Sequence, residues 1–591
     1  MPRMVPFLQR LRLMRYHVLA ADYDGTLAHA GRISDTTWAA LHRLCDSGRK
    51  LVMVTGRELE DVLSLIGEPE LFARIVAENG AVLYRPATKE VRMLAAPPPP
   101  AFVEELRARG VDQLAAGRVI VASREPYQDA VLHVIRDLGL ELQVIFNKGA
   151  VMVLPSGVNK ATGLAAALGE LGLSPHNAVG VGDAENDHAL LLACECGVAV
   201  GNALPALRDK ADLVTAASCG DGVAELIDRL VANDLADLGP QLARHQIAIG
   251  TIDHATISFD PYAANIMVCG TSGSGKSTLT TGLLERLGEG GYQFTIVDPE
   301  GDYASLENAA VLGGQQREPL VEEVIDVVRD PSHNVVANLL GVAASQRPEC
   351  FARLLAALAE FRVRTGRPHW LVVDEAHHVL PAAREPAADP IAVPSRGVIY
   401  VTVHPGSVAP SILTALDTLL VVGDRPRETV MELCQAAGVA VPAIRAIGRL
   451  PTGHALYWRV GTPDTAVIRF EPPKHERTRH SRKYVEGNLG QARSFYFRGP
   501  DAKLNLRAHN LLLFIQLGDG VDDETWQHHR RNGDYSRWFR DEVKDEQLAA
   551  EAETIERSSL NASDCRAAIR AAVERRYTLP ADGPTGVVDV A

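Results

Sequence analysis

The strongest constraint on the fold is a repeated pattern, in which a short apolar run ends in acidic or glycine-rich residues. VLAADYDGTL places Asp22 and Asp24 directly after an apolar run, and NIMVCGTSGSGKST leads into the glycine-rich stretch Gly270–Ser277. Such runs, separated by helical patterns, predict parallel strands joined by crossover helices, and ligands bind at the carboxyl ends of such strands. We therefore expect an α/β protein with two separate sites that handle phosphate groups.

The spacing of these runs divides the chain into three units. Residues 16–230 and 245–470 each alternate apolar runs with helical patterns, which predicts two α/β units. Within the first, the proline-rich APPPPAF opens an inserted segment, about residues 92–154, with strands and helices of its own. A polar and basic linker follows the second unit, and residues 488–580 form a small helix-rich module in this interpretation.

Composition and charge limit where such a chain works and what it binds. The apolar content of 46% and the charged content of 23% are ordinary for a globular protein, and no apolar run could span a bilayer. The net charge of −14 argues against nucleic-acid binding by the whole surface, though not against a local basic channel. Eight cysteines scattered through apolar segments suit a reducing compartment. These features predict a cytoplasmic protein that does not bind a membrane.

The first acidic motif has the composition of a phosphoryl-transfer site. Asp22 and Asp24 would repel each other unless a cation lies between them, which indicates Mg²⁺. The same cation would screen a phosphate group from an attacking carboxylate, so that Asp22 could act as a nucleophile and form an aspartyl-phosphate. Asp24 is placed to protonate the leaving oxygen and then to activate water.

Three later segments supply the other groups that this chemistry needs. VMVTGR ends a strand with Thr55, whose hydroxyl can donate to the phosphate, and GVNKATGL offers Lys160 as a cation. VGVGDAENDHAL ends a further strand with Asp183, a candidate direct metal ligand, and continues to Asn186 and Asp187, candidates for the inner or outer shell of the metal.

This set of motifs, in this order, resembles the haloacid dehalogenase superfamily and its Cof-type phosphatase branch. The resemblance covers about residues 16–230 and includes AENGAVLY, VAVGNA and ADLVTAASCGDGV. It implies a Rossmann-like core, dependence on Mg²⁺, and a small α+β cap inserted between the Thr55 and Lys160 motifs. Members of this branch hydrolyse small phosphate monoesters such as sugar phosphates and phosphoglycolate, so a small phosphorylated metabolite is the implied substrate.

The second site has the pattern of a P-loop, and it lies between an apolar strand and a helical segment, as such a loop requires. Backbone N–H groups of the loop would hold the β-phosphate of ATP, Lys276 would bridge the β- and γ-phosphates, and Ser277 would bind Mg²⁺. The nucleotide-binding candidates are Gly270, Ser272, Gly273, Ser274, Gly275, Lys276, Ser277, Thr278 and, from a later strand, Asp374.

The later strand, HWLVVDEAHH, ends in two neighbouring carboxylates. Asp374 would hold the shell of the Mg²⁺ ion, and Glu375 would polarise the attacking water. A kinase needs no carboxylate for water, because its acceptor is a substrate hydroxyl. The acidic pair therefore favours hydrolysis of ATP.

The second unit also resembles the HerA/FtsK-like ATPases, over about residues 245–470 and through TIVDPEGDY and the lead-in IAIG…ATISFD. The resemblance implies a RecA-like α/β domain, a ring-shaped homo-oligomer with an arginine from a neighbouring subunit, and a nucleic acid or protein as the partner. Arg425 and Arg427 are candidates for that arginine. The family's usual sensor glutamine is replaced, since VIYVTVHPGS presents Thr402 and His404 there.

Three interpretations of the whole chain remain open. The first is a bifunctional protein with a Mg²⁺-dependent phosphatase and a separate ATPase. The second is a polynucleotide phosphatase–kinase in which the P-loop unit is the kinase, and the third is a scaffold that ATP switches. In the C-terminal module, His528, His529 and Asp534 could suggest a metal site, but adjacent histidines on a helix point about 100° apart. A helical module with Trp526, Trp538 and Phe539 in its core is the favoured interpretation.

Overall fold

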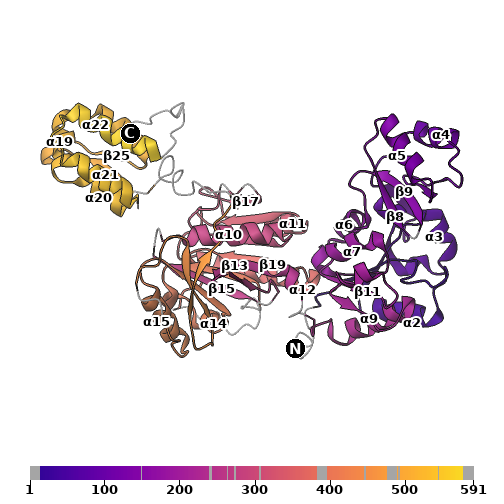
Figure 1. Ribbon diagram of the computed structural model, residues 1–591. Helices are drawn as coiled ribbons and strands as arrows, with labels where there is room; N and C mark the ends of the chain where they lie inside the picture. The colour runs from indigo at the N-terminus through magenta and orange to yellow at the C-terminus, as the bar shows by residue number, and fades with distance from the viewer. Residues whose placement is uncertain are drawn as a thin grey trace.

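The computed structural model describes residues 14–147, 149–238, 242–262, 264–271, 274–304, 306, 308–382, 396–444, 448–474, 489, 493–543 and 545–576. Along the colour ramp of Figure 1, three bodies follow one another from indigo through magenta and orange to yellow. Each body contains a sheet or hairpin and a buried apolar cluster of its own.

The first body is built on an eight-stranded sheet in the order β12-β11-β10-β1-β2-β3-β4-β5. Its strands from β12 to β3 pair in parallel, whereas β4 and β5 are added antiparallel at one edge. The strands are β1 (Val18–Ala21), β2 (Lys50–Val54), β3 (Phe72–Ala77), β4 (Val82–Arg85), β5 (Glu90–Met93), β10 (Ala178–Gly182), β11 (Cys196–Ala199) and β12 (Leu213–Val214). The helices are α2 (Asp35–Asp46), α3 (Leu59–Leu65), α6 (Lys160–Leu171), α7 (His188–Ala193), α8 (Pro205–Arg208) and α9 (Cys219–Asn233).

A small α+β unit is inserted between β5 and α6, where the sequence predicts a cap. Its antiparallel sheet has the order β6-β7-β9-β8, with β6 (Ala115–Ala116), β7 (Val121–Arg124), β8 (Leu142–Asn147) and β9 (Ala150–Pro155). Two helices, α4 (Pro100–Ala108) and α5 (Gln128–Asp137), bury Phe102, Leu106 and Val134 against it. This separate apolar cluster allows the inserted unit to fold over the core as a unit of its own.

The second body contains an eleven-stranded sheet in the order β14-β13-β23-β22-β21-β15-β20-β19-β16-β18-β17. The seven strands from β21 to β17 are parallel, and the four at the other edge are antiparallel. The strands are β13 (Ile247–Ile252), β14 (Ala255–Phe259), β15 (Asn265–Gly270), β16 (Gln293–Asp298), β17 (Ala309–Gly313), β18 (Asn334–Asn338), β19 (His369–Val373), β20 (Val398–Thr402), β21 (Thr418–Val422), β22 (His454–Arg459) and β23 (Ala466–Phe470). The helices are α10 (Lys276–Glu289), α11 (Val321–Val328), α12 (Arg347–Thr365), α13 (Ala376–Val379), α14 (Pro410–Leu413) and α15 (Pro426–Ala437).

The third body is the helix-rich module that the sequence predicts, and Trp526, Trp538 and Phe539 are buried in its core. His529 is hydrogen-bonded through both ring nitrogens, since Nδ1 lies 2.8 Å from Asp534 and Nε2 accepts from a backbone N–H, so it serves the fold. The elements are β24 (Phe495–Phe497), β25 (Leu506–Ala508), α18 (Leu511–Gly520), α19 (Asp523–Arg531), α20 (Asp534–Asp541), α21 (Glu546–Glu556) and α22 (Ala562–Arg576).

Candidate functional site

The first candidate site lies at the carboxyl ends of three neighbouring strands of the eight-stranded sheet. Asp22 follows β1, Thr55 follows β2 and Asp183 follows β10, and β1 pairs with both of the others. All three side chains are buried, with exposures of 4%, 1% and 3%. Parallel pairing thus gathers at one edge three residues that are far apart in the sequence.

Lys160 joins this group from the first position of α6, whose N-terminus is capped by the side chain of Asn159. Its Nζ donates to Asp22 Oδ1 at 2.5 Å and to Asp187 Oδ1 at 2.6 Å. The side chain of Lys160 is 1% exposed, so this is a buried cation held between two buried carboxylates. A buried charge of this kind is strongly destabilising unless it is paired, and the pairing holds all three side chains in place.

Burial and charge act against each other on the pKa values of this group. Burial raises the pKa of the Asp22 carboxyl to about 7, although the ammonium of Lys160 acts to lower it. Burial acts to lower the pKa of Lys160, but the charges of Asp187 and Asp22 outweigh it and the pKa is raised. Lys160 is therefore a permanent positive charge beside the carboxylate that would attack a phosphate group.

Three carboxylates in this group fit a hard divalent cation. Asp22, Asp183 and Asp187 each offer an oxygen within 4.8 Å of the others, and all three residues are buried. Oxygen ligands of this kind suit Mg²⁺. Asp187 also accepts from the backbone N–H groups of Asp183 and Ala184 through Oδ2, at 2.9 and 3.0 Å. These contacts fix the orientation of the Asp187 carboxylate, and its direct ligation of an ion stays a prediction.

Two residues that the sequence analysis did not select complete the arrangement. Arg57 forms a two-pronged contact with the carboxylate of Asp24, from Nε at 2.6 Å and from Nη2 at 2.8 Å. Asn202 donates to Gly25 O at 2.9 Å and lies 3.4 Å from Asp183 Oδ2. Arg57 lies two residues after Thr55, so its position after the end of the same strand was the only indication of its role in the sequence. Direct ligation of a metal by the Asp24 carboxylate stays a prediction.

The second candidate site lies on β15 and α10 of the eleven-stranded sheet. Gly270 ends β15 at φ 153°, and Gly275 precedes α10 at φ 100°, both in a region of the backbone that favours glycine. Lys276 is buried, and its Nζ donates to Thr271 O at 3.1 Å. Ser274 donates to the same carbonyl at 2.7 Å. Ser277 and Thr278 are the next residues of α10, and Ser272 and Gly273 lie outside the described residues.

The acidic pair follows β19, which is separated from the P-loop strand by β20 alone. Burial lowers the pKa of Lys276, whereas the charges of Glu375 and Asp374 act to raise it, which agrees with the nearby strand ends that carry the three groups. Asp374 is buried, and Glu375 has a left-handed backbone conformation at φ 42°. A left-handed non-glycine residue is strained, and such strain is concentrated at functional sites.

Thr402 ends β20, the strand between the P-loop strand and the strand that precedes the acidic pair. It is fully buried, and its hydroxyl oxygen lies 3.0 Å from Nδ1 of His377. Burial, with the neighbouring His378 and His404, lowers the pKa of His377 to about 4. His377 is therefore neutral at pH 7, and its ring lies edge-on to that of His404 with 5.4 Å between centroids.

Asp298 of the TIVDPEGDY motif holds a turn. Its carboxylate accepts from the backbone N–H groups of Gly301, Asp302 and Tyr303, at 2.8, 3.0 and 2.8 Å. This turn brings Glu300 close enough to influence the pKa of Lys276. The two arginines considered for a neighbouring subunit, Arg425 and Arg427, are exposed at the start of α15.

Comparisons with known proteins match two parts of the chain. The family model for haloacid dehalogenase-like hydrolases matches residues 19–106 and 115–227, and that for AAA domains matches residues 261–391. Among curated proteins, one named phosphoglycolate phosphatase from Natronomonas pharaonis is 34% identical over 222 residues, which are 36% of this chain and 96% of that protein. A protein of the same name from Methanothermobacter thermautotrophicus is 33% identical over 225 residues, 36% of this chain and 98% of that protein.

A solved haloacid dehalogenase-like hydrolase from Bacteroides thetaiotaomicron is 23% identical with a TM-score of 0.33, and it covers 36% of this chain and 100% of its own. Among the described helices, none combines the length and the apolar character needed to cross a membrane. The family models and the curated relatives show that the chain belongs, through its first α/β unit, to the haloacid dehalogenase-like hydrolases, and that an AAA-type P-loop domain follows that unit.

Proposed function

We propose that the first unit hydrolyses small phosphate monoesters with the help of Mg²⁺, through an aspartyl-phosphate on Asp22. The observation that carries this proposal is the buried lysine, Lys160, held between Asp22 and Asp187 beside Asp183. A nucleophile, a fixed positive charge and a set of oxygen ligands are thereby gathered at one sheet edge. Bound Mg²⁺ would draw negative charge from the phosphate group and neutralise the carboxylates around it.

The residues of this chain divide the reaction between them. Lys160 holds Oδ1 of Asp22, so the other oxygen is the one available to attack phosphorus. The bond from phosphorus to the alcohol oxygen breaks, and Asp24 gives that oxygen a proton, which requires that one Asp24 oxygen leaves Arg57 and carries the proton beforehand. Asp24 then takes a proton from water, which releases phosphate and restores the Asp22 carboxylate. Thr55 supplies a hydroxyl that can orient the phosphate oxygens.

The position of the inserted unit supports the proposal that the substrate is small. Strand β9 carries Met152, whose sulfur lies 3.7 Å from the position that a β-carbon on Gly56 would take. Gly56 follows Thr55 directly, so the inserted unit approaches the catalytic edge at this point. The related proteins named phosphoglycolate phosphatase make phosphoglycolate the first substrate to test. The Cof-type assignment belongs to this proposal and is supported by the position of the insertion.

For the second unit we propose binding and hydrolysis of ATP, independent of the phosphatase reaction. The grouping of Lys276 with Asp374 and Glu375 supports it, because Glu375 offers a base for water that a kinase would not need. The HerA/FtsK-like assignment is part of the same proposal, and the turn around Asp298 supports it. A ring-shaped homo-oligomer that acts on nucleic acid or protein is what such an assignment would imply.

Two single variants test whether the sites are separate. Asp22→Asn should abolish release of phosphate from phosphoglycolate and leave ATP hydrolysis intact, and Lys276→Ala should do the reverse. Each variant serves as the folding control for the other, since each should keep one activity. Persistence of ATP hydrolysis in Lys276→Ala, together with its loss in Asp22→Asn, would show that the first site performs both reactions.

A second assay separates the ATPase from a kinase. The full chain is incubated with ATP labelled at the γ-phosphate and an oligonucleotide that carries a 5′-hydroxyl. We expect labelled free phosphate and an unlabelled oligonucleotide. A labelled oligonucleotide would replace the ATPase proposal with a polynucleotide phosphatase–kinase.

A further inference from the structure

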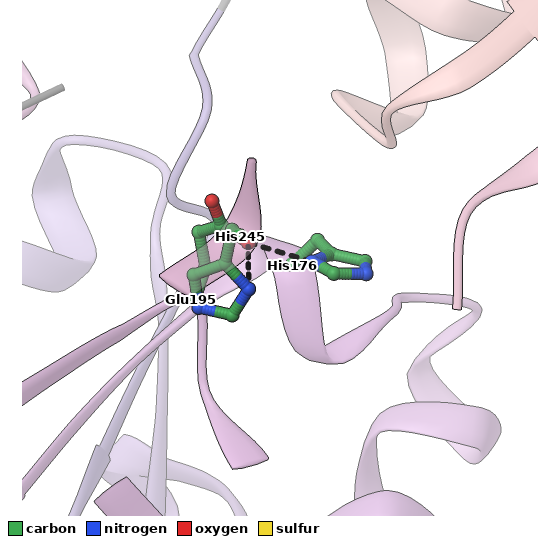
Figure 2. Close-up of side chains that lie close together, drawn as sticks. All are labelled: His176, Glu195 and His245. Carbon is green, nitrogen blue, oxygen red and sulfur yellow. Dashed lines mark hydrogen bonds and ion pairs between the residues drawn. The ribbon is translucent and has the colours of Figure 1, made fainter. Parts of the chain in front are cut away.

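A second group of possible metal ligands lies at the boundary between the first and second bodies, away from the catalytic edge. It consists of His176 in the turn Pro175–Asn177, Glu195 just before β11, and His245 at the end of the turn Ala243–His245. One ligand atom from each lies within 4.8 Å of the other two. Figure 2 shows both imidazole rings turned toward the Glu195 carboxylate.

The two nitrogens of His176 have different partners. Nε2 lies 2.7 Å from the carbonyl oxygen of Gly290, which follows the P-loop helix α10. A carbonyl only accepts hydrogen bonds, so Nε2 must carry a proton. Nδ1 lies 2.6 Å from Glu195 Oε2. Two lone pairs would face each other there unless a proton or a metal cation lies between Nδ1 and the carboxylate.

A proton between His176 and Glu195 would not account for the position of His245 beside the same carboxylate. Its Nδ1 lies 3.6 Å from the same Oε2 atom, which is too long for a hydrogen bond. Two ligands of one tetrahedral zinc ion, bonded at about 2.0–2.2 Å, lie roughly 3.3–3.6 Å apart. The separation between His245 and Glu195 is thus that of two ligands of one ion.

The surroundings of the group also resemble those of bound metals. Metal-ligating histidines generally donate their other N–H to a carbonyl or carboxylate, as His176 does to Gly290. The remaining oxygen of Glu195 accepts from Arg15, which fixes the carboxylate. Tyr292 stacks on the His176 ring at 4.0 Å between centroids and 12° between planes, which fixes the ring.

We propose that His176, Glu195 and His245 bind one divalent ion of the zinc class between the phosphatase unit and the P-loop unit. Two imidazoles and one carboxylate are a ligand set that zinc accepts, with a fourth position left for water. The ion replaces the proton between His176 and Glu195, so binding releases a proton and widens that contact to roughly 3.3 Å. The site is distinct from the oxygen-only group around Asp22, which suits Mg²⁺.

The test measures metal binding by the full chain, and it does not depend on either proposed activity. Protein stripped with a chelator is titrated with Zn²⁺ against a chromogenic competitor, in excess Mg²⁺ so that the oxygen-only group is filled. His245→Gln removes a ligand, and His133→Gln, on the exposed face of α5, is the matched control. Asp183→Asn removes a carboxylate from the oxygen-only group.

We expect one Zn²⁺ per chain in the unmodified protein, in His133→Gln and in Asp183→Asn. Loss of an outer-shell partner alone weakens metal binding about 10–100-fold, so His245→Gln should weaken it at least about 100-fold. Co²⁺ in place of Zn²⁺ should give the intense visible absorption of a tetrahedral nitrogen–oxygen site, and this should disappear in His245→Gln. Absence of Zn²⁺ binding in the unmodified protein, or equal binding in His245→Gln, would overturn the proposal and leave a protonated His176–Glu195 pair.

Discussion

Replacement of Lys160 by methionine tests the central contact of the phosphatase site. Methionine has a similar length and no charge, so the change leaves no large cavity. It removes the two hydrogen bonds that Lys160 Nζ donates, one of 2.5 Å to Asp22 and one of 2.6 Å to Asp187. The two carboxylates then face each other in a buried site. Because the ammonium opposes the effect of burial, the pKa of Asp22, already about 7, should rise further.

The loss of stability follows from these two contacts. A hydrogen bond to a charged group contributes about 1.5–3 kcal/mol, and breaking a buried ion pair by removing one partner costs about 3–5 kcal/mol. We therefore expect the free energy of unfolding of the first unit to fall by about 3–5 kcal/mol. For a domain of about 200 residues each kcal/mol lowers Tm by about 2–4 °C, so its transition should move down by roughly 6–20 °C.

The loss of activity should be larger than any effect of partial unfolding. Removing one preorganised charge donor from a transition state costs about 10²–10³ in kcat, and Asp22 also becomes less ionised at neutral pH. The assay is release of phosphate from phosphoglycolate and from para-nitrophenyl phosphate at saturating Mg²⁺, well below the Tm of the variant. ATP hydrolysis by the second unit, measured in parallel, should stay within about twofold.

Lys210→Met is the matched control, because Lys210 is exposed and the substitution is the same. It should change neither Tm nor kcat. A Lys160→Met protein that keeps kcat within tenfold of the unmodified enzyme, with or without a fall in Tm, would show that the buried cation is a structural pair only. The assignment of Asp22 as nucleophile would then lose its main support.

Two further outcomes follow from the same edge of the sheet. In Gly182→Ala a β-carbon would lie 2.5 Å from Cγ of Asp187, so Asp187 must move away from Lys160. We expect phosphatase activity to fall at least about tenfold while ATP hydrolysis is unchanged. Equal phosphatase activity would mean that Asp187 is not needed to hold the lysine. Removal of divalent ions with a chelator should abolish phosphate release. Mg²⁺ should restore it where Ca²⁺ does not, because Mg²⁺ demands the smaller octahedral site. Full activity without any divalent ion would contradict the cation site.

The sequence alone predicted most of the groups at both sites, because each lies where an apolar strand ends. Asp22, Thr55 and Asp183 are local signals of this kind, and the parallel order of the strands brings them together. The P-loop and Asp374 were predictable for the same reason. Arg57 was not selected, since one arginine after a strand looks like any surface cation until the fold places it on Asp24.

Only the tertiary structure decided what each polar group does with its neighbours. The sequence offered Asp187 as a metal ligand, which stays a prediction, and the structure shows that its two oxygens also accept from Lys160 and from two backbone N–H groups. Likewise, His176, Glu195 and His245 show no motif in the sequence, because they come from segments that are far apart in the chain. Periodicity and strand ends are local properties that a sequence displays, whereas contacts between distant turns depend on how whole units pack, and no local pattern records them.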